Sequence, residues 1–213
     1  MRCIVPIVEG PGDVEAAPVL LRKILSEHLR SFDIAVAKPK KAGGRSALDR
    51  AGGVEKFVEY AAITPDCGAI LVLVDADDDC APGWAQQICI RCSHLGINVP
   101  IAIVCAVREY EVWFLASLDS IRGNPMRGSF AFKEDAVYEG DIEALSGVKE
   151  WIGHQLPPGR AYKETTDQPS MTALIDVPLA HANSRSFRRL CHAVEELRDA
   201  MDAGLATTSP SGP

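Results

Sequence analysis

The sequence of 213 residues predicts an α/β protein, with a parallel sheet flanked by helices and a helical C-terminal appendage. Apolar segments of strand length alternate with segments of helical period as far as residue 116, which is typical of crossover units between parallel strands. Residues 69–74 form an unbroken aliphatic run, as expected for a strand that is buried on both faces. The composition, 47% hydrophobic and 24% charged, is that of a globular protein with a sizeable core.

The first elements are a strand, a turn, a helix and a second strand. Residues 3–8 form the first apolar strand, and residues 9–13 form a tight glycine-rich turn. Pro18 is tolerated only in the first turn of a helix, so the following helix either starts near Ala17 or is kinked there. A second strand is expected over residues 32–37.

The middle of the chain supplies the centre of the sheet. Residues 38–45 are basic and rich in glycine, so we expect a mobile loop there. A helix is expected over residues 53–62, followed by the central strand over residues 68–74. A further helix over residues 84–95 and a strand over residues 99–107 complete the pattern of four strands and three helices.

The pattern changes after residue 117. The expected segments are an irregular stretch at 120–140, a helix at 142–155, a break at 156–159, a short helix at 170–175 and a final amphipathic helix around 187–201. We therefore predict a core over residues 1–116 and a helical appendage packed on it over residues 117–203. Residues 204–213 are small and polar, which predicts a disordered tail.

The net charge and the cysteine content limit the partners and the cellular compartment that we expect for this protein. The net charge of −7 argues against coating of nucleic acid by the whole surface, although a local site remains possible. No apolar run reaches the roughly 20 residues of a membrane helix, and residues 1–8 lack the layout of a signal peptide. The seven cysteines are odd in number and mostly lie in apolar segments, as reduced thiols do. We expect a cytoplasmic protein without membrane contact.

Acidic residues follow three of the expected strands: Glu9 the first, Asp75 and Asp77 the central one, Glu109 and Glu111 the last. Because the carboxyl ends of parallel strands lie along one edge of a sheet, these acids should converge. Their hard oxygen atoms suit Mg²⁺ or Mn²⁺, and such a site suits a phosphate ester as substrate. The alternative is that Asp77 and the two aspartates after it cap the next helix and face water.

Basic residues are grouped in the segments expected to border this edge. Those we expect to contact phosphate are Lys41, Arg45, Lys163 and Arg185, within a wider set that includes Lys38, Lys40, Arg160, Arg188 and Arg189. For any single one of them, a solvated surface charge is the competing interpretation. As a group, cations around an acidic metal site would steer a phosphodiester inward.

Two short motifs carry a resemblance to a known family. Val8-Glu9-Gly10-Pro11-Gly12-Asp13 after the first strand and Asp75-Ala76-Asp77 after the third resemble the Toprim domain of topoisomerases, bacterial primases and overcoming-lysogenization-defect nucleases. The match covers about residues 1–116. The whole chain, including residues 108–116 and the start of the last helix at 184–187, is similar to uncharacterised bacterial Toprim-like proteins.

The resemblance implies a role for each matching acid. Glu9 would act in proton transfer or metal binding, Asp75 and Asp77 would bind Mg²⁺, and Asp13 matches the second acid of the nuclease subgroup. The chain has no Gly-x-x-x-x-Gly-Lys-Ser/Thr motif, so an ATPase like that of many such nucleases would be a separate protein. Nor is there an evident Tyr-bearing cleavage domain, which argues against topoisomerase activity.

Metal-dependent cleavage of DNA or RNA is therefore the expected activity, in bacterial phage defence or DNA processing. Glu109 and Glu111 would assist: on an extended segment both point to one side, whereas on a helix only one can face the site. The alternative is that Glu109 pairs with Arg108 or Arg185. A homo-oligomer is compatible with the sequence, and a non-catalytic binding module with a vestigial site is the competing function.

Overall fold

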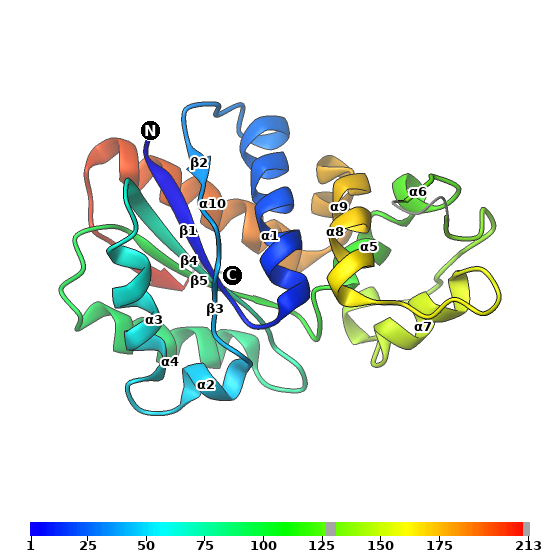
Figure 1. The fold of residues 1–213 in the computed structure, drawn as a ribbon, viewed down its shortest axis with the longest axis horizontal. Coiled ribbons are helices and arrows are strands. Elements are labelled where there is room, and N and C mark those ends of the chain that lie inside the picture. Colours follow the sequence, from blue (N-terminus) through cyan, green and yellow to red (C-terminus); the bar gives the residue numbers. More distant parts are fainter. Residues whose placement is uncertain (127–130, 211–213) are drawn as a thin grey trace.

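A computed structural model describes residues 1–126 and 131–210 and has a parallel sheet between two layers of helices (Figure 1). The strands are β1 (Cys3–Val8), β2 (Ala35–Val36), β3 (Lys40–Lys41), β4 (Cys67–Asp75), β5 (Ile101–Ala106) and β6 (Thr208–Pro210). They are ordered β2-β1-β4-β5-β6, with β3 also paired to β1, and every recorded pairing is parallel. The predicted fold class is confirmed.

The three long strands form the hydrophobic centre of the sheet. All six residues of β1 and of β5 are buried, as are residues 69–74 of β4. Such strands read as continuous apolar runs because helices cover both of their faces. Val8 pairs with Leu73 and Asp75 pairs with Ala106, so the acids that follow these strands emerge along one edge.

Helices cover the sheet on two sides. One core contains Ile4, Val8 and residues of α1 (Pro11–Lys23), its π-helical extension η1 (Ile24–His28) and α10 (Arg185–Ala203). The other contains Val5, Ile7 and residues of α3 (Gly53–Ala62) and α4 (Ala81–Ser93), with α2 (Arg45–Asp49) beside them. Successive strand residues point to opposite faces, which is why Ile4 and Val5 belong to different cores.

The C-terminal region shares the first core. Its elements before α10 are α5 (Val112–Ala116), α6 (Leu118–Ile121), the 3₁₀ turn η2 (Ile142–Ala144), α7 (Val148–Gln155), α8 (Glu164–Leu174) and α9 (Val177–Asn183). Helix α8 packs beside α1, and α10 packs on β5 and β4 (Figure 1). The helical region is therefore attached to the sheet along α1 and α10.

Two helix starts differ from the expectations. Helix α1 begins at Pro11 and continues through Pro18, and α8 begins at Glu164 and continues through Pro169, well before the expected start at 170. A proline inside a helix removes one backbone hydrogen bond. Packing of buried residues such as Ala17 and Leu20 on α1 offsets that loss.

The basic loop expected to be mobile at 38–45 is held against the sheet. Lys40 and Lys41 pair with the end of β1, and the expected strand over 32–37 shortens to β2. The free edge of β1 offers backbone groups that must be satisfied, and Ala42 N–H donates to Val8 O at 2.8 Å. Arg45, expected in the loop, instead starts α2 and is buried.

The expected disordered tail at 204–213 is wrong for the residues that the structure describes. Gly204 ends α10 with φ 66°, the chain reverses, and β6 pairs with Ile101–Ile103 of β5. Without β6, β5 would present unpaired backbone groups at the sheet edge. Residues 211–213 lie outside the described residues.

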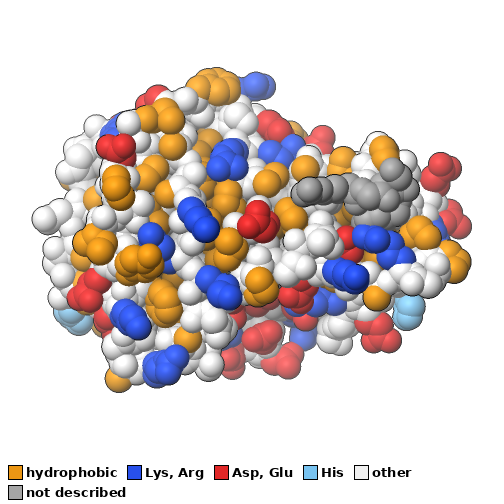
Figure 2. All heavy atoms as spheres, in the orientation of Figure 1, with side chains coloured by type: hydrophobic (Ala, Val, Ile, Leu, Met, Phe, Trp, Pro, Cys, Tyr) orange, Lys and Arg blue, Asp and Glu red, His pale blue; other side chains and the backbone are white. Residues whose placement is uncertain are grey.

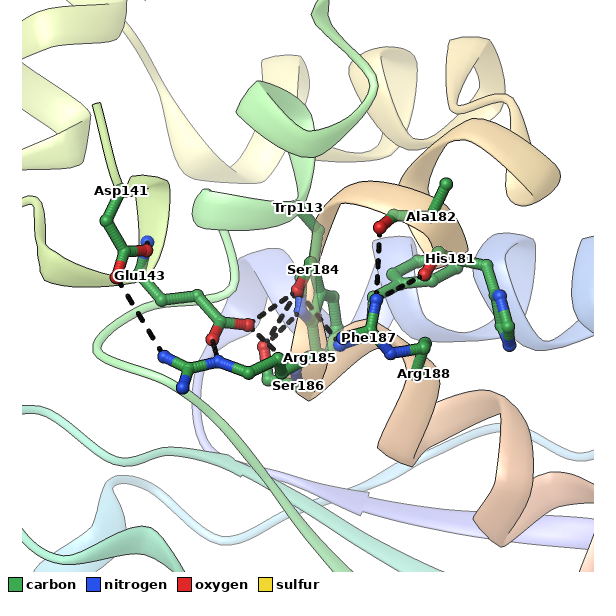
Figure 3. Close-up of polar contacts among 10 residues, drawn as sticks. All are labelled: Trp113, Asp141, Glu143, His181, Ala182, Ser184, Arg185, Ser186, Phe187 and Arg188. Carbon is green, nitrogen blue, oxygen red and sulfur yellow. Dashed lines mark hydrogen bonds and ion pairs between the residues drawn. The ribbon is translucent and has the colours of Figure 1, made fainter. Parts of the chain in front are cut away.

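A buried acid joins η2 to the start of α10 (Figure 3). Glu143 accepts hydrogen bonds from Ser184 Oγ at 2.8 Å, Ser186 N at 2.7 Å and Arg185 Nε at 3.0 Å. Trp113 Nε1 donates to Ser186 Oγ at 3.0 Å, which ties α5 to the same cluster. A carboxylate at a helix N-terminus satisfies free amides and the helix dipole, so this cluster fixes the first turn of α10.

Two features concern the expectations about membrane spans and disulfide bonds. Within the described residues, no helix is both long enough and apolar enough to cross a membrane, and all seven cysteines are free thiols.

Candidate functional site

A cavity of about 410 Å³ opens where β1, β3 and β4 end. The lining residues, which define what we call the acidic cavity, are Glu9, Gly10, Pro11, Asp13, Lys41, Gly43, Gly44, Asp75, Glu111, Lys149, Glu164 and Gln168. They come from the ends of the strands, from the first turn of α1, from the loop after β3, from the segment after β5 and from α7 and α8. Ligands of open α/β folds commonly bind at this edge, so the acidic cavity is the candidate site.

Glu9 links the ends of β1 and β4. Its Oε1 accepts a hydrogen bond from the N–H of Asp75 at 2.8 Å, and its backbone carbonyl accepts from Gly43 and Gly44. Burial raises the pKa of Glu9, although backbone amides partly offset this. The nearby carboxylates of Asp13 and Asp77 raise this pKa further.

Asp13 lies in the first turn of α1 and faces α8. Its Oδ2 accepts from Gly10 N at 2.9 Å and its Oδ1 accepts from Gln168 Nε2 at 2.8 Å. Burial raises the pKa of the Asp13 carboxyl, and these two hydrogen bonds oppose the rise. Gly12 allows the two helices to approach, because a Cβ there would overlap the side-chain oxygen of Gln168.

Asp75 is the last residue of β4 and the electrostatic centre of the acidic cavity. Its Oδ1 accepts a hydrogen bond from Tyr110 N–H at 2.8 Å. Burial raises the pKa of Asp75 well above its usual range, and the carboxylates of Glu111, Asp13 and Glu9 add to this. Four acids from three separate segments therefore interact through one cavity.

Glu111 is the most deeply buried of these acids, with 1% of its surface exposed. Its Oε1 accepts from the Tyr162 hydroxyl at 3.0 Å, and its Oε2 lies 3.8 Å from Lys149 Nζ. Burial raises the pKa of Glu111 to about 7, against the lowering effect of Lys149. At neutral pH this carboxyl can therefore both accept and give up a proton.

Four residues of the site were not anticipated from the sequence: Lys149, Tyr162, Glu164 and Gln168. They lie on or beside α7 and α8, and of these two helices it is α8 that packs against α1. No sequence motif marks these residues. Only their positions in the folded chain identify them, since none of them is adjacent in the sequence to an acid at the end of a strand.

The aspartates after Asp75 are not among the residues that line the acidic cavity. Asp77, Asp78 and Asp79 are exposed; Asp78 pairs with Arg108 at 2.6 Å and Asp79 pairs with Arg45 at 2.9 Å. Asp77 has φ 50° and donates its N–H to Arg108 O. The charge of Asp77 raises the pKa of Glu9. Asp77 itself does not line the acidic cavity, whereas Asp75 does.

Glu109 and Glu111 have different surroundings. They precede α5, and of the two it is Glu111 that lines the acidic cavity. Glu109 Oε2 is buried and forms no hydrogen bond with the residues that the structure describes. The alternative, a pairing of Glu109 with Arg108 or Arg185, is not found among them either: those arginines bond to Asp78 and Glu143.

The four expected phosphate-binding residues have different positions. Lys41 is exposed and lines the acidic cavity. Arg45 is buried and donates to the carbonyls of Asp75 and Ala76 at 3.3 and 2.7 Å, so it holds the loop after β4. Lys163 precedes α8 and lines an adjoining cavity, and Arg185 pairs with Glu143 away from the acidic cavity. On the face drawn in Figure 2, Lys and Arg side chains are scattered among hydrophobic and acidic ones.

The acidic cavity suits a divalent cation by its donor chemistry. Glu9, Asp75 and Glu111 each accept a recorded hydrogen bond on one carboxylate oxygen, whereas both oxygens of Asp13 are engaged. Glu9 and Asp75 fit as ligands, and Asp13 fits as an orienting residue. In the described parts of the chain, however, no group of three or more His, Cys, Asp or Glu residues already stands at metal-binding spacing.

Comparisons with known proteins place the chain by its sequence. The family model described as "Domain of unknown function (DUF4276)" matches residues 8–195. No curated protein and no solved structure matches the chain.

Proposed function

The chain belongs to the DUF4276 domain family, and from the chemistry of its acidic cavity we propose that it hydrolyses nucleic-acid phosphodiesters with the help of Mg²⁺ or Mn²⁺. We further propose that it acts in the cytoplasm, with an ATPase, where one is needed, as a separate partner.

One observation carries the proposal: Glu9, Asp13, Asp75 and Glu111 converge on one cavity and all have a raised pKa. Keeping such acids together in a partly dehydrated cavity is unfavourable unless a cation or protons offset their charge. Phosphoryl transfer needs such a cluster, because carboxylates hold the cations that neutralise a phosphate.

The residues divide into ligands, a proton carrier and orienting groups. Glu9 and Asp75 would hold the cation, which when bound supplies charge stabilisation to the phosphate oxygens. Glu111, with a pKa of about 7, would take a proton from the attacking water or give one to the leaving oxygen. The Tyr162 hydroxyl, 3.0 Å from Glu111 Oε1, orients that carboxyl.

Two further features support a nucleic-acid substrate. The motifs around Glu9 and Asp75 resemble the Toprim domain, which handles nucleic-acid phosphodiesters, and Lys41 lines the cavity beside these acids. The net charge of −7 confines contact with a polyanion to such local cations.

A cleavage assay tests the proposal. Purified protein is incubated with single- and double-stranded DNA and RNA in Mg²⁺ or Mn²⁺, beside Glu9→Gln, Asp75→Asn and Glu111→Gln. Metal-dependent cleavage should be lost in all three and kept in Asp78→Asn, whose carboxylate is exposed and bonded to Arg108. Absence of cleavage by the native protein on every substrate, with metal and a neighbouring ATPase present, would reject catalysis.

The second candidate is a non-catalytic nucleic-acid or partner-binding module. The observation in its favour is the absence, among the described residues, of acids already at metal-binding spacing. It predicts metal-independent binding without cleavage, and binding that survives Asp75→Asn.

A further inference from the structure

Lys149 lines the acidic cavity, where a positive charge would offset the charge of the carboxylates. We propose that Lys149 is its built-in counter-ion and competes with a divalent cation for the same carboxylates, so that metal loading releases the lysine. The inference rests on the metal-binding part of the proposed function and assigns a role to a residue of α7.

The contacts of Lys149 are with two acids of the cavity. Its Nζ lies 2.8 Å from Glu164 Oε1 and 3.8 Å from Glu111 Oε2. The side chain is half-buried, with 37% of its surface exposed, whereas Glu111 is almost fully buried. An ammonium held between two carboxylates offsets charge that would otherwise be uncompensated in a dehydrated site.

The influence of Lys149 extends beyond its direct partners. Lys149 lines the acidic cavity together with Asp13 and Asp75, with which it has no direct ion pair. The acidic cavity has five acids in its lining, with Lys41 as the other lysine. Lys41 is exposed and has no recorded ion pair within the described residues, so Lys149 is the better-placed counter-ion.

A lysine and a divalent cation cannot both neutralise these acids without repelling each other. Two positive charges about 4 Å apart repel strongly in a partly buried site. Lys149 also lines the adjoining cavity of about 720 Å³, together with Lys163 and Tyr162. Its flexible side chain therefore has space to move away from Glu111 when a cation binds.

Metal affinity is the first test. Mn²⁺ is titrated into the native protein, Lys149→Met and the matched control Lys163→Met, with binding followed by calorimetry or by the Mn²⁺ electron paramagnetic resonance signal. Removing a partly exposed ion pair should tighten Mn²⁺ binding by about fivefold in Lys149→Met. Lys163→Met should bind like the native protein, because Lys163 lines the adjoining cavity and not the acidic one.

A second measurement uses the native protein and needs no substitution. Lysine acylation by a small reagent is followed by mass spectrometry with and without Mn²⁺. Held by the carboxylates of Glu164 and Glu111, Lys149 should react slowly in chelator and several-fold faster in Mn²⁺, because its release from these ion pairs makes the amine accessible to the reagent. The exposed Lys163 should react at the same rate in both conditions.

The outcomes separate the inference from the proposed function. Mn²⁺ binding by the native protein that is unchanged or weaker in Lys149→Met, with Lys149 acylation unaffected by Mn²⁺, overturns the counter-ion role and leaves the metal site standing. No Mn²⁺ binding by the native protein overturns both. If Lys149→Met fails to fold, the counter-ion role is decided by the native protein alone, from the ratio of its Lys149 acylation rates with and without Mn²⁺.

Discussion

Glu111 couples the ionisation of the acidic cavity to the stability of the fold. Its pKa is raised from 4.5 to about 7, because burial disfavours the carboxylate. Between these two values the native state keeps a proton that the unfolded chain has released. The free energy of unfolding should therefore fall as the pH rises from about 4.5 to about 7 in the absence of metal.

The Glu111→Gln variant should remove the part of this dependence that Glu111 contributes, although Glu9, Asp13 and Asp75 also have raised pKa values. Glutamine can still accept the hydrogen bond from Tyr162 but cannot ionise, so the decline, at most about 3 kcal/mol for this shift, should flatten. Urea unfolding at several pH values in chelator measures it. The exposed Glu150→Gln on α7 is the control, and an equal decline in Glu111→Gln would contradict the assignment.

Glu143 stabilises the fold at the start of α10 and does not line the acidic cavity. Replacement by glutamine should cost about 2 kcal/mol, because an amide group would face donors that now bond to a buried carboxylate (Figure 3). Chemical denaturation measures the loss. Asp141→Asn, an exposed residue 3.9 Å from Arg185, should change stability by less than about 0.5 kcal/mol.

At the scale of elements, the contact between α1 and α8 assembles the site. Asp13 on α1 accepts from Gln168 on α8, and α8 also places Glu164 beside Lys149. Gly12 makes this approach possible, since a side chain there would meet Gln168 and Glu164. The acidic cavity therefore depends on helices from both ends of the chain.

The Gly12→Ala variant tests this contact. Overlap with Gln168 should destabilise the protein by about 1–3 kcal/mol and weaken Mn²⁺ binding, because the Asp13 to Gln168 hydrogen bond is displaced. Gly153→Ala is the matched control: it lies inside α7 with open space around it, so it should be neutral or stabilising by about 0.5–1 kcal/mol. Equal effects at both positions would argue against a close helix contact.

For the whole molecule, a cation bound at the acidic cavity, as proposed, would join β1 and β4 through Glu9 and Asp75. At about 100 times its dissociation constant, Mn²⁺ should stabilise the native state by about 2.7 kcal/mol, or raise the melting temperature by about 5–10 °C. Thermal melts with Mn²⁺ and with chelator measure the shift. Asp75→Asn should abolish it, and a shift of the same size in that variant would mean that the ion binds elsewhere.

Local pattern and chain order were enough to predict the sheet and the acids at its edge. The short aliphatic run at residues 69–74 predicts a strand that is buried on both faces, and parallel pairing places whatever follows β1, β4 and β5 at one edge. Glu9, Asp75 and Glu111 could therefore be named in advance. The separation of Asp77 from Asp75 could not, because it depends on the φ of one residue and on the partners of its neighbours.

Tertiary packing decided the rest. Gln168 reaches the acidic cavity because α8 packs on α1, a contact between segments more than 100 residues apart that no local pattern encodes. Lys149 and Tyr162 reach it through their contacts with Glu164 and Glu111, which are also distant from each other in the sequence. The same holds for Arg45, which is buried under the β4 loop instead of facing solvent, and for β6, which pairs with β5 instead of remaining disordered. Periodicity and propensity act over a few residues, so they determined which strands form and where each acid emerges. Which distant side chains complete the site depends on the burial of shared surface between helices and sheet, which only the folded chain specifies.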